Sequence, residues 1–232
     1  MRNACSRPHL SALPREVENL AYFRVAKSGW RGARSFAWFE LVKLLPLFVI
    51  FALTAQAAEL SLKDVDGAVQ RPLADVGQAA TVLFFVLHDC PIANAYAPEI
   101  SRIAEEFRGR GVRAFVIYRE DDFTPAEARM HAREYAYRCP ALLDSKGTLA
   151  RAAGATVSPE AAVFSAKGAL LYRGRIDDRV ISPGKHRAEP HERDLRAALE
   201  AILAGKPVRE RFTRAIGCYL PRDSDNPAPL KP

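Results

Sequence analysis

Residues 80–100, ATVLFFVLHDCPIANAYAPEI, decide the fold of this chain. The first eight of them, 80–87, carry no charge and are rich in β-branched and aromatic side chains, which predicts a strand covered on both faces of a sheet. From Pro98 to Phe107, apolar residues recur at helical spacing, and charged residues occupy the other faces. The stretch therefore predicts a buried strand that leads into a helix packed on the same sheet.

Cys90 lies at the junction between this strand and this helix. The unpaired amides and the dipole of a first helical turn stabilise a thiolate, which is the form of cysteine that attacks disulfides and peroxides. We therefore interpret Cys90 as a candidate nucleophile, and we expect it to be alkylated faster than the other cysteines at neutral pH. The alternative is a small buried side chain that only packs, as many free cysteines do.

Most of the positive charge lies at the N-terminal end of the chain. The 232 residues have a formal charge of +7, but residues 1–58 hold eight Lys or Arg against three Asp or Glu, so a charge of +2 remains for the rest. Beyond residue 58, no block of basic residues interleaved with aromatic residues is found. The sequence therefore predicts no nucleic-acid partner.

Residues 44–58, LLPLFVIFALTAQAA, form an uncharged run that ends in the small-x-small pattern Ala55-Gln56-Ala57. The run is shorter than the roughly 20 residues of a bilayer span, so it predicts a cleaved signal peptide and no stable membrane span after cleavage. An uncleaved anchor is the alternative. We expect a periplasmic or otherwise exported protein, with a leader over residues 1–57. Residues 1–41 are interpreted as a possible gene-model artefact, because a start at Val42 would give a compact signal peptide.

The remainder of the chain predicts an α/β fold with a central mixed sheet flanked by helices. A strand, helix, strand, helix order implies a right-handed parallel crossover, and a hairpin and a last helix follow. We expect one domain over residues 58–205 and an extended, proline-rich tail over residues 206–232. The expected strands are 80–87, 114–118, 141–143, 160–164 and 170–174, and the expected helices are 98–107, about 124–135, 148–153 and 193–204.

This order of elements, with a cysteine after the first central strand and a proline before the hairpin, resembles the thioredoxin-like fold and its redoxin branch. The resemblance covers about residues 60–204 and rests on FFVLHDCP (84–91), ALLDSKGTLARAAGATVSPEAAVF (141–164) and GALLYRGRIDDR (168–179). The branch includes the thioredoxin-like proteins of cytochrome maturation and the alkyl hydroperoxide reductase/thiol-specific antioxidant group. The chain is most similar to secreted redoxins of unassigned activity with a DCPIxNxYAPEI-type site and a GC-x-[IL]-P-like tail.

The resemblance implies a thiol-dependent oxidoreductase without a cofactor. Its substrate would be a disulfide or a peroxide, carried by a protein or a small molecule, and an external thiol reductant would reset it. The resemblance also implies that Pro159 is a cis-proline facing the active cysteine, with an ordinary trans proline as the alternative.

The chain departs from the redoxin pattern in ways that bear on the chemistry. Ala93 stands where a C-x-x-C site has its second cysteine, so Cys90 has no local thiol to resolve a mixed disulfide. Leu87 stands where a peroxiredoxin has a Thr, and the Ser-Pro-Glu stretch before the hairpin lacks an Arg. These differences argue against efficient peroxiredoxin chemistry.

A resolving thiol would therefore have to come from elsewhere in the chain. Three cysteines remain after the leader, Cys90, Cys139 and Cys218, and an odd number leaves at least one without a partner in the chain. Cys218 lies in the tail and is a possible resolving thiol if the tail folds back over the site. The alternative is a Cys218 that is free or paired with another chain. We interpret Cys139 as a packing residue.

The residues beside the thiol offer further hypotheses. His88 is a candidate catalytic residue that favours the thiolate or carries a proton. Asp89 would oppose thiolate formation by its charge, or it would cap the helix.

A second class of function is a non-enzymatic module that binds a partner peptide or a copper ion. His186 and His191, together with Cys90 and His88, are the residues that one would consider as copper ligands. The chain lacks a C-x-x-x-C or C-x-x-C pair, so the sequence predicts no metal site. Arg173, Arg175, Asp177 and Asp178 are interpreted as a solvated ion-pair loop without chemistry.

Overall fold

The computed structural model describes residues 60–221. The expected leader over residues 1–57 lies outside the described residues. Within them, no helix has both the length and the apolar character needed to cross a membrane. The strands are β1 (Leu62–Lys63), β2 (Val69–Gln70), β3 (Ala80–Val86), β4 (Val112–Tyr118), β5 (Ala141–Leu143), β6 (Val157–Ser158), β7 (Glu160–Ser165), β8 (Leu170–Gly174), β9 (Val180–Ser182), β10 (Lys185–His186) and β11 (Cys218–Tyr219). The helices are α2 (Pro91–Arg108), α3 (Pro125–Glu134), α4 (Thr148–Ala153) and α5 (Asp194–Leu203).

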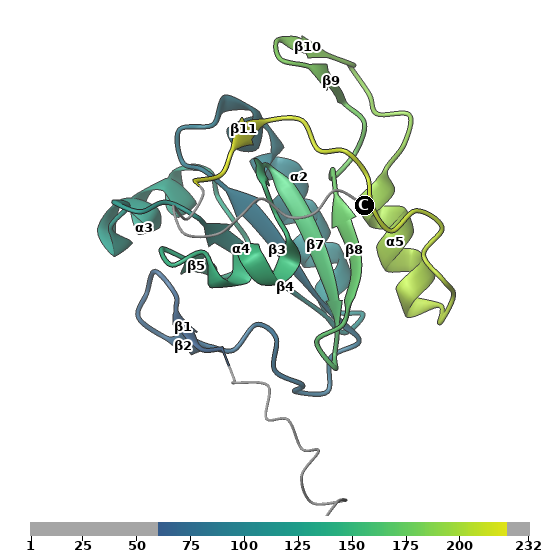
Figure 1. Ribbon diagram of the computed structural model, residues 1–232, viewed down its shortest axis with the longest axis horizontal. Coiled ribbons are helices and arrows are strands. Elements are labelled where there is room, and N and C mark those ends of the chain that lie inside the picture. The colour runs from purple at the N-terminus through teal and green to yellow at the C-terminus, as the bar shows by residue number, and fades with distance from the viewer. Residues whose placement is uncertain (1–59, 222–232) are drawn as a thin grey trace, which may run out of the picture. The chain divides into compact units, whose positions relative to one another are not determined.

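A five-stranded sheet in the order β5-β4-β3-β7-β8 forms the centre of the fold (Figure 1). Strand β3 pairs in parallel with β4 and antiparallel with β7, and β4 pairs in parallel with β5. Strand β8 completes the antiparallel half by pairing with β7. The prediction of a central mixed sheet flanked by helices is therefore confirmed.

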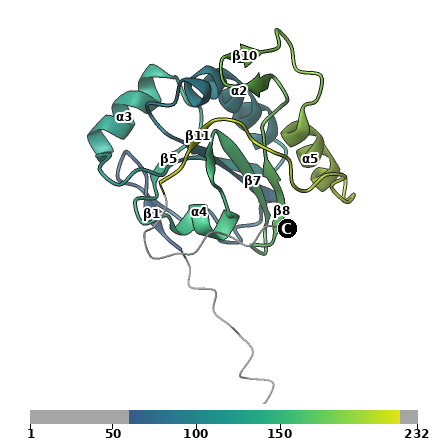
Figure 2. The same ribbon diagram turned by 45° about the horizontal axis from the view of Figure 1, so that its top comes forward.

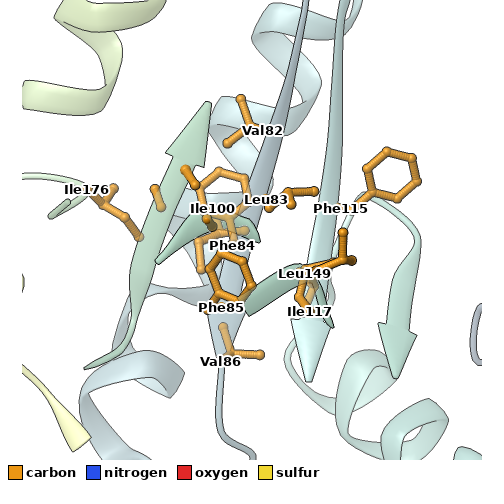
Figure 3. Packing of buried hydrophobic residues seen from close by; sticks show 14 of the residues in the cluster. Val82, Leu83, Phe84, Phe85, Val86, Ile100, Phe115, Ile117, Leu149 and Ile176 are labelled. Atoms are coloured by element: carbon orange, nitrogen blue, oxygen red, sulfur yellow. The ribbon is translucent and has the colours of Figure 1, made fainter. Parts of the chain in front are cut away.

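The core lies on both faces of β3, which is buried at every residue. Figure 3 shows Phe84 and Phe85 of this strand packed among Ile100 of α2, Ile117 of β4 and Leu149 of α4. Helix α2 lies behind the sheet and α4 in front of it in Figures 1 and 2. Because successive side chains of a strand point to opposite faces, a strand covered on both sides is predominantly apolar along its whole length.

Local signals define the starts of helices α2 and α3. Thr124 caps α3 with a capping box, in which its hydroxyl accepts from the Glu127 amide at 3.3 Å and the Glu127 carboxylate accepts from the Thr124 amide at 2.8 Å. Pro125 follows at the first turn, where a missing N–H leaves no helical hydrogen bond unmade. Helix α2 also has a proline in its first turn, and it extends seven residues further toward the N-terminus than the expected 98–107. Pro98 lies inside it.

The C-terminal segment packs more closely than an extended tail without a core would require. Residues 211–221, which we call the C-terminal strap, leave the side of α5 and cross to the far side of the domain (Figures 1 and 2). Strand β11 of the strap pairs antiparallel with β6, with Cys218 opposite Ser158 and Tyr219 opposite Val157. The tail is extended, as expected, but as far as residue 221 it is a packed part of the domain.

Candidate active site

Cys90 is the N-cap residue of α2 and is completely buried. Strand β3 ends four residues earlier, and the turn between them is closed by a hydrogen bond from the Cys90 amide to the Leu87 carbonyl at 3.3 Å. The Cys90 thiol donates to the carbonyl of Ser158 at 3.2 Å. We expected a readily alkylated thiol. Because Cys90 is completely buried, however, a reagent reaches its sulfur only when the residues that cover it move.

The loop before β7 is fastened to the turn that carries Cys90. The Ser158 hydroxyl accepts from the Leu87 amide at 2.8 Å, while the Ser158 carbonyl accepts from the Cys90 thiol. The peptide bond between Ser158 and Pro159 is cis. This confirms the cis conformation that the resemblance implied for Pro159, whereas its catalytic role stays a prediction.

The strap is anchored upstream of Cys218 by Thr213. The Thr213 amide donates to the Arg173 carbonyl at 3.1 Å, and the Thr213 hydroxyl accepts from the Arg175 amide at 3.0 Å. The same hydroxyl lies 2.7 Å from the Tyr172 hydroxyl. These contacts lay the beginning of the strap along the end of β8.

A second anchor lies downstream of Cys218. The Leu220 side chain is only 5% exposed, and its amide donates to the Thr156 carbonyl at 3.0 Å. Between the two anchors, Gly217 makes a very close approach, because a Cβ atom at this position would lie 1.9 Å from the Ser158 carbonyl oxygen. Only a glycine allows the strap to approach the cis-proline loop this closely.

The strap brings Cys218 next to Cys90. The pKa of Cys218 is raised to about 11, first by burial and then by a side-chain hydrogen bond with Cys90 and by the charges of Cys90 and Asp89. Both cysteines are reduced, and Cys218 is partly exposed. The prediction that the tail can place a second thiol over the site fits this geometry, and the resolving role itself is taken up below.

His88 is placed beside the site by partners other than the thiol. Its Nδ1 lies 2.5 Å from the Glu120 carboxylate, which also accepts from the His88 amide at 2.6 Å. Its ring stacks on Phe123, with the ring centroids 4.5 Å apart. Within residues 60–221, the imidazole is hydrogen-bonded to Glu120 and not to Cys90, which weakens the hypothesis that it acts directly on the thiol.

A polar network that the sequence did not reveal lies behind His88. The Asn94 amide group donates to the His88 carbonyl at 2.8 Å, and the Asn94 carbonyl oxygen lies 3.1 Å from Nε2 of His131. The other ring nitrogen of His131 lies 2.8 Å from the Tyr118 hydroxyl. Because Asn94 accepts here, Nε2 of His131 carries the proton and Nδ1 accepts from Tyr118. The pKa of His131 is lowered, first by burial and then by the charge of His88.

The spacing of two residues in the sequence could have pointed to His131. His131 lies three residues after Ala128, so both are on the same face of α3. In the structure this face is the buried one. Asp89, in contrast, is exposed and precedes the N-cap residue. The alternative that Asp89 caps the helix is wrong, because Cys90 occupies the cap position.

Cys139 fits the expected packing role. Its side chain packs against the core, and burial raises its pKa to about 12, so its thiol stays protonated.

The loop after β8 is buried, which corrects the prediction of a solvated ion-pair loop. Asp177 and Asp178 are 3% and 7% exposed. Asp177 accepts from the Tyr96 hydroxyl and forms an ion pair with Arg179 at 3.2 Å. Asp178 accepts from the amide of His191 at 2.7 Å. These carboxylates can be buried because they accept hydrogen bonds from Tyr96 of α2 and from the long loop that contains the unexpected hairpin β9–β10.

A largely apolar groove of about 340 Å³ lies beside the start of α2. Its lining includes Pro91, Ile92, Tyr96 and Val180, with His186 at the hairpin side. In residues 60–221, no group of three or more His, Cys, Asp or Glu side chains is arranged to hold a metal ion.

The comparisons with known proteins agree with this architecture. The family model described as AhpC/TSA family matches residues 53–173. An uncharacterized conserved protein from Geobacillus kaustophilus is 29% identical, with 74% of this chain and 92% of that chain covered and a TM-score of 0.62. A hypothetical protein from Sinorhizobium meliloti is 27% identical, with 71% and 91% covered and a TM-score of 0.61. The comparison with curated proteins found no match.

Proposed function

From the premise that the chain belongs to the AhpC/TSA family, we propose that it is an exported thiol-dependent oxidoreductase in which Cys90 attacks a disulfide or a peroxide and Cys218 resolves the product. One observation carries this proposal. Strand β11 has Cys218 opposite Ser158, and the Ser158 carbonyl accepts a hydrogen bond from the Cys90 thiol. Two cysteines that are far apart in the sequence thus both lie beside the backbone of Ser158.

The start of α2 suits a thiolate at Cys90. The first amides of a helix lack partners within the helix, and no side chain caps those of α2. The Cys90 side chain stands at the cap position, where a negative sulfur would accept hydrogen bonds from these amides. Pro91 provides no amide of its own, so the amides of the next residues would carry this role.

With a peroxide ROOH, the proposed cycle begins when the Cys90 thiolate attacks an oxygen atom. The O–O bond breaks, RO⁻ leaves and takes up a proton to form ROH, and Cys90 becomes a sulfenic acid. The Cys218 thiol then attacks the Cys90 sulfur, a disulfide forms and water leaves. Two electrons from an external thiol reductant return both residues to thiols.

With a disulfide substrate RSSR, the same two residues complete the reaction. The Cys90 thiolate attacks one sulfur and releases RS⁻, which leaves a mixed disulfide on Cys90. Cys218 then attacks the Cys90 sulfur and releases the second thiol as RSH. Because Cys90 is completely buried, either substrate reaches it only when the residues that cover it move, which favours small molecules over folded proteins.

His88 has an indirect role in this proposal. Its carbonyl and its amide are held by Asn94 and Glu120, so the residue fixes the turn that carries Cys90. We assign it as a positioning residue rather than as a base that acts on the thiol. Export rests on the signal-peptide pattern of residues 44–58.

Peptide mapping after a single oxidation tests the proposal. The reduced protein is treated with one equivalent of hydrogen peroxide and digested without reduction, and the expected product is a peptide that joins Cys90 to Cys218. The variant Cys218→Ser should instead accumulate sulfenic and sulfinic acid on Cys90, while Cys139→Ser should behave like the unmodified chain. Sulfinic acid on Cys90 with a free Cys218 in the unmodified chain would refute the two-cysteine cycle.

The complete burial of Cys90 argues against an accessible nucleophile, so we keep a second candidate, a non-enzymatic module that binds a partner peptide or a copper ion. The same experiment separates the two. A binding module would leave both thiols unoxidised under conditions in which a small-molecule thiol is consumed. Binding of Cu(I) that is lost in Cys90→Ser would then support the metal-binding form of this candidate.

A further inference from the structure

A second groove, of about 590 Å³, lies along the first half of β4, and we call it the β4 groove. Its walls come from the loop before β3, from the C-terminal half of α2 and from residues 111–115. Cys139 and Pro140, which precede β5, complete the lining. Among the described residues that line it, Arg108 and Arg113 are cations, and none is an aspartate or a glutamate. The β4 groove is therefore positively charged.

The first half of β4 has a free edge in this groove. Strand β5 pairs with β4 over Val116–Tyr118. The Val116 amide donates to the Pro140 carbonyl at 3.0 Å, so the backbone groups of Ala114, two residues earlier, point to the same edge. The ladder ends here because Pro140 has no N–H to donate to the Ala114 carbonyl. Within residues 60–221, Ala114 thus has no neighbouring strand on this edge.

The two arginines of the groove have no carboxylate partner among residues 60–221. Arg113 donates to the Arg71 carbonyl at 3.1 Å, and its guanidinium lies 4.9 Å from the centroid of the Phe115 ring. Arg108 donates to the Arg138 carbonyl. Partial burial lowers the pKa of Arg113, because the charged guanidinium loses hydration there. A carboxylate brought into the groove would replace this lost hydration with charge-assisted hydrogen bonds.

The remaining lining offers apolar surface. Val112 and Phe115 are buried, at 4% and 2% exposed. Val76, from the loop before β3, is 65% exposed although it is a large apolar side chain. A ligand that covers Val76 would remove apolar surface from water, which favours binding.

We propose that the β4 groove binds an extended acidic segment of a partner protein, which pairs with the free edge of β4 at Ala114 and places carboxylates beside Arg108 and Arg113. The open backbone edge favours a peptide over a small anion, because an added strand supplies the N–H and C=O groups that the edge lacks. Neither Cys90 nor Cys218 lines this groove. Partner binding here is therefore independent of the redox chemistry of the proposed function.

Binding of a synthetic peptide tests this assignment. The probe is a short fluorescein-labelled peptide of alternating Glu and Val, and its affinity is measured by fluorescence anisotropy at low and at physiological salt. We expect saturable binding that weakens as salt is added, because exposed charges are screened. A peptide of alternating Lys and Val should bind more weakly by about tenfold or more.

Two exposed valines provide a matched pair of variants. Val76→Asp places a carboxylate in the groove and should weaken binding of the Glu–Val peptide by about tenfold or more. Val69→Asp adds the same charge at a residue that is 61% exposed and does not line the groove. The side chain of Val69 points away from that of Gln70, which lines the groove, so the affinity should change by less than about twofold. Equal losses in both variants would show that only the net charge matters and would overturn the proposal.

Arg113→Gln keeps a donor for the Arg71 carbonyl and removes the charge. It should also weaken binding by about tenfold or more. Arg102→Gln is its control, since Arg102 is an exposed residue of α2 that pairs with Glu99 and does not line the groove. Circular dichroism of each variant verifies that the fold is retained. An unchanged affinity in a folded Arg113→Gln would overturn the proposal.

Two further ligands separate strand pairing from simple anion binding. An acidic peptide with Pro in place of each Val lacks the N–H groups for pairing and should bind more weakly by about tenfold or more. Citrate, a small tricarboxylate, should displace the Glu–Val peptide only in large excess. Equal binding of the Glu–Pro peptide, or displacement by citrate at matched concentration, would identify a small-anion site and refute the peptide assignment. If no peptide binds, the arginines only protect the edge from pairing, and the proposal is wrong.

Discussion

Cys90 and Cys218 are neighbours in space, yet the regions that hold them are built differently. Cys90 stands between β3 and α2, whose side chains form the centre of the core. Cys218 stands on the strap, which is held by backbone pairing, one hydroxyl and one buried leucine. Loss of a few contacts would thus release the strap and leave the rest of the domain folded. The comparison distinguishes a thiol that is held by the core from a thiol on a segment that can detach from the domain.

The largest expected effect comes from the region of Cys90. Phe84→Ala should lower the free energy of unfolding by about 3–5 kcal/mol, because it opens a cavity at a completely buried position of β3. Denaturant unfolding measures this value. A change similar to that of a substitution in the strap would contradict the distinction between the two regions.

A smaller effect, confined to the strap, is expected for Gly217→Ala. The added Cβ atom would lie 1.9 Å from the Ser158 carbonyl oxygen, so the strap has to move away from the cis-proline loop. Peroxide-driven formation of the Cys90–Cys218 disulfide should slow by about tenfold or more, which corresponds to an activation barrier higher by about 1.4 kcal/mol. Gly109→Ala is the matched control, because its Cβ atom would meet no atom within 4 Å. Equal rates in both variants would rule out the strap geometry as the reason for the pairing.

A severalfold effect is expected when the downstream anchor is weakened. Leu220→Ala removes most of a buried side chain, so the strap should open more often and expose Cys90. Iodoacetamide should then alkylate Cys90 faster than in the unmodified chain, whereas Cys139 should react at an unchanged rate. Faster labelling of Cys139 as well would indicate a general loss of structure rather than opening of the strap.

The smallest expected effect is a pH dependence of the stability of the fold that arises from His131 in the network next to Cys90. The pKa of His131 is lowered mainly by burial, so the unfolded chain binds a proton more readily than the folded one. The stabilisation by neutral His131 is complete above about pH 6.5, the pKa of a histidine in the unfolded chain. It is lost as the pH falls toward the lower pKa of His131 in the folded chain. Unfolding midpoints at pH 7.5 and 5.5 should differ more for the unmodified chain than for His131→Gln. The same difference in both would show that other groups carry the pH dependence.

The two regions also differ in how far the sequence predicts them. The run of 80–87 is short, uncharged and rich in β-branched and aromatic residues, which favours a covered strand. The helical spacing that follows places Cys90 at the end of this strand, so this region follows from local patterns. The short strands β6 and β11 have two residues each, which is too few for any periodicity. Their pairing depends on Gly217 and on the shape of the Ser158 loop, which are properties of the folded chain. For this reason Cys218 could be proposed as a partner but not placed.

The same reasoning explains the errors around the site. Asp177 and Asp178 are charged residues in a loop, for which exposure is the usual outcome. Their burial depends on donors from distant residues, Tyr96 and His191, that no local pattern reveals. The network of His131, Asn94 and Tyr118 likewise joins two helices and a strand.

The two anchors of the strap also decide the kinetic order of the second thiol's reaction. In the proposed function, β11 holds Cys218 beside Cys90, so the attack of Cys218 on an oxidised Cys90 would be unimolecular. Effective molarities of well-oriented intramolecular reactions reach about 10⁵ M and above, far beyond any concentration of a competing thiol in solution. The rate of disulfide closure should therefore stay constant on dilution, and disulfide-linked dimers should stay rare even in concentrated protein.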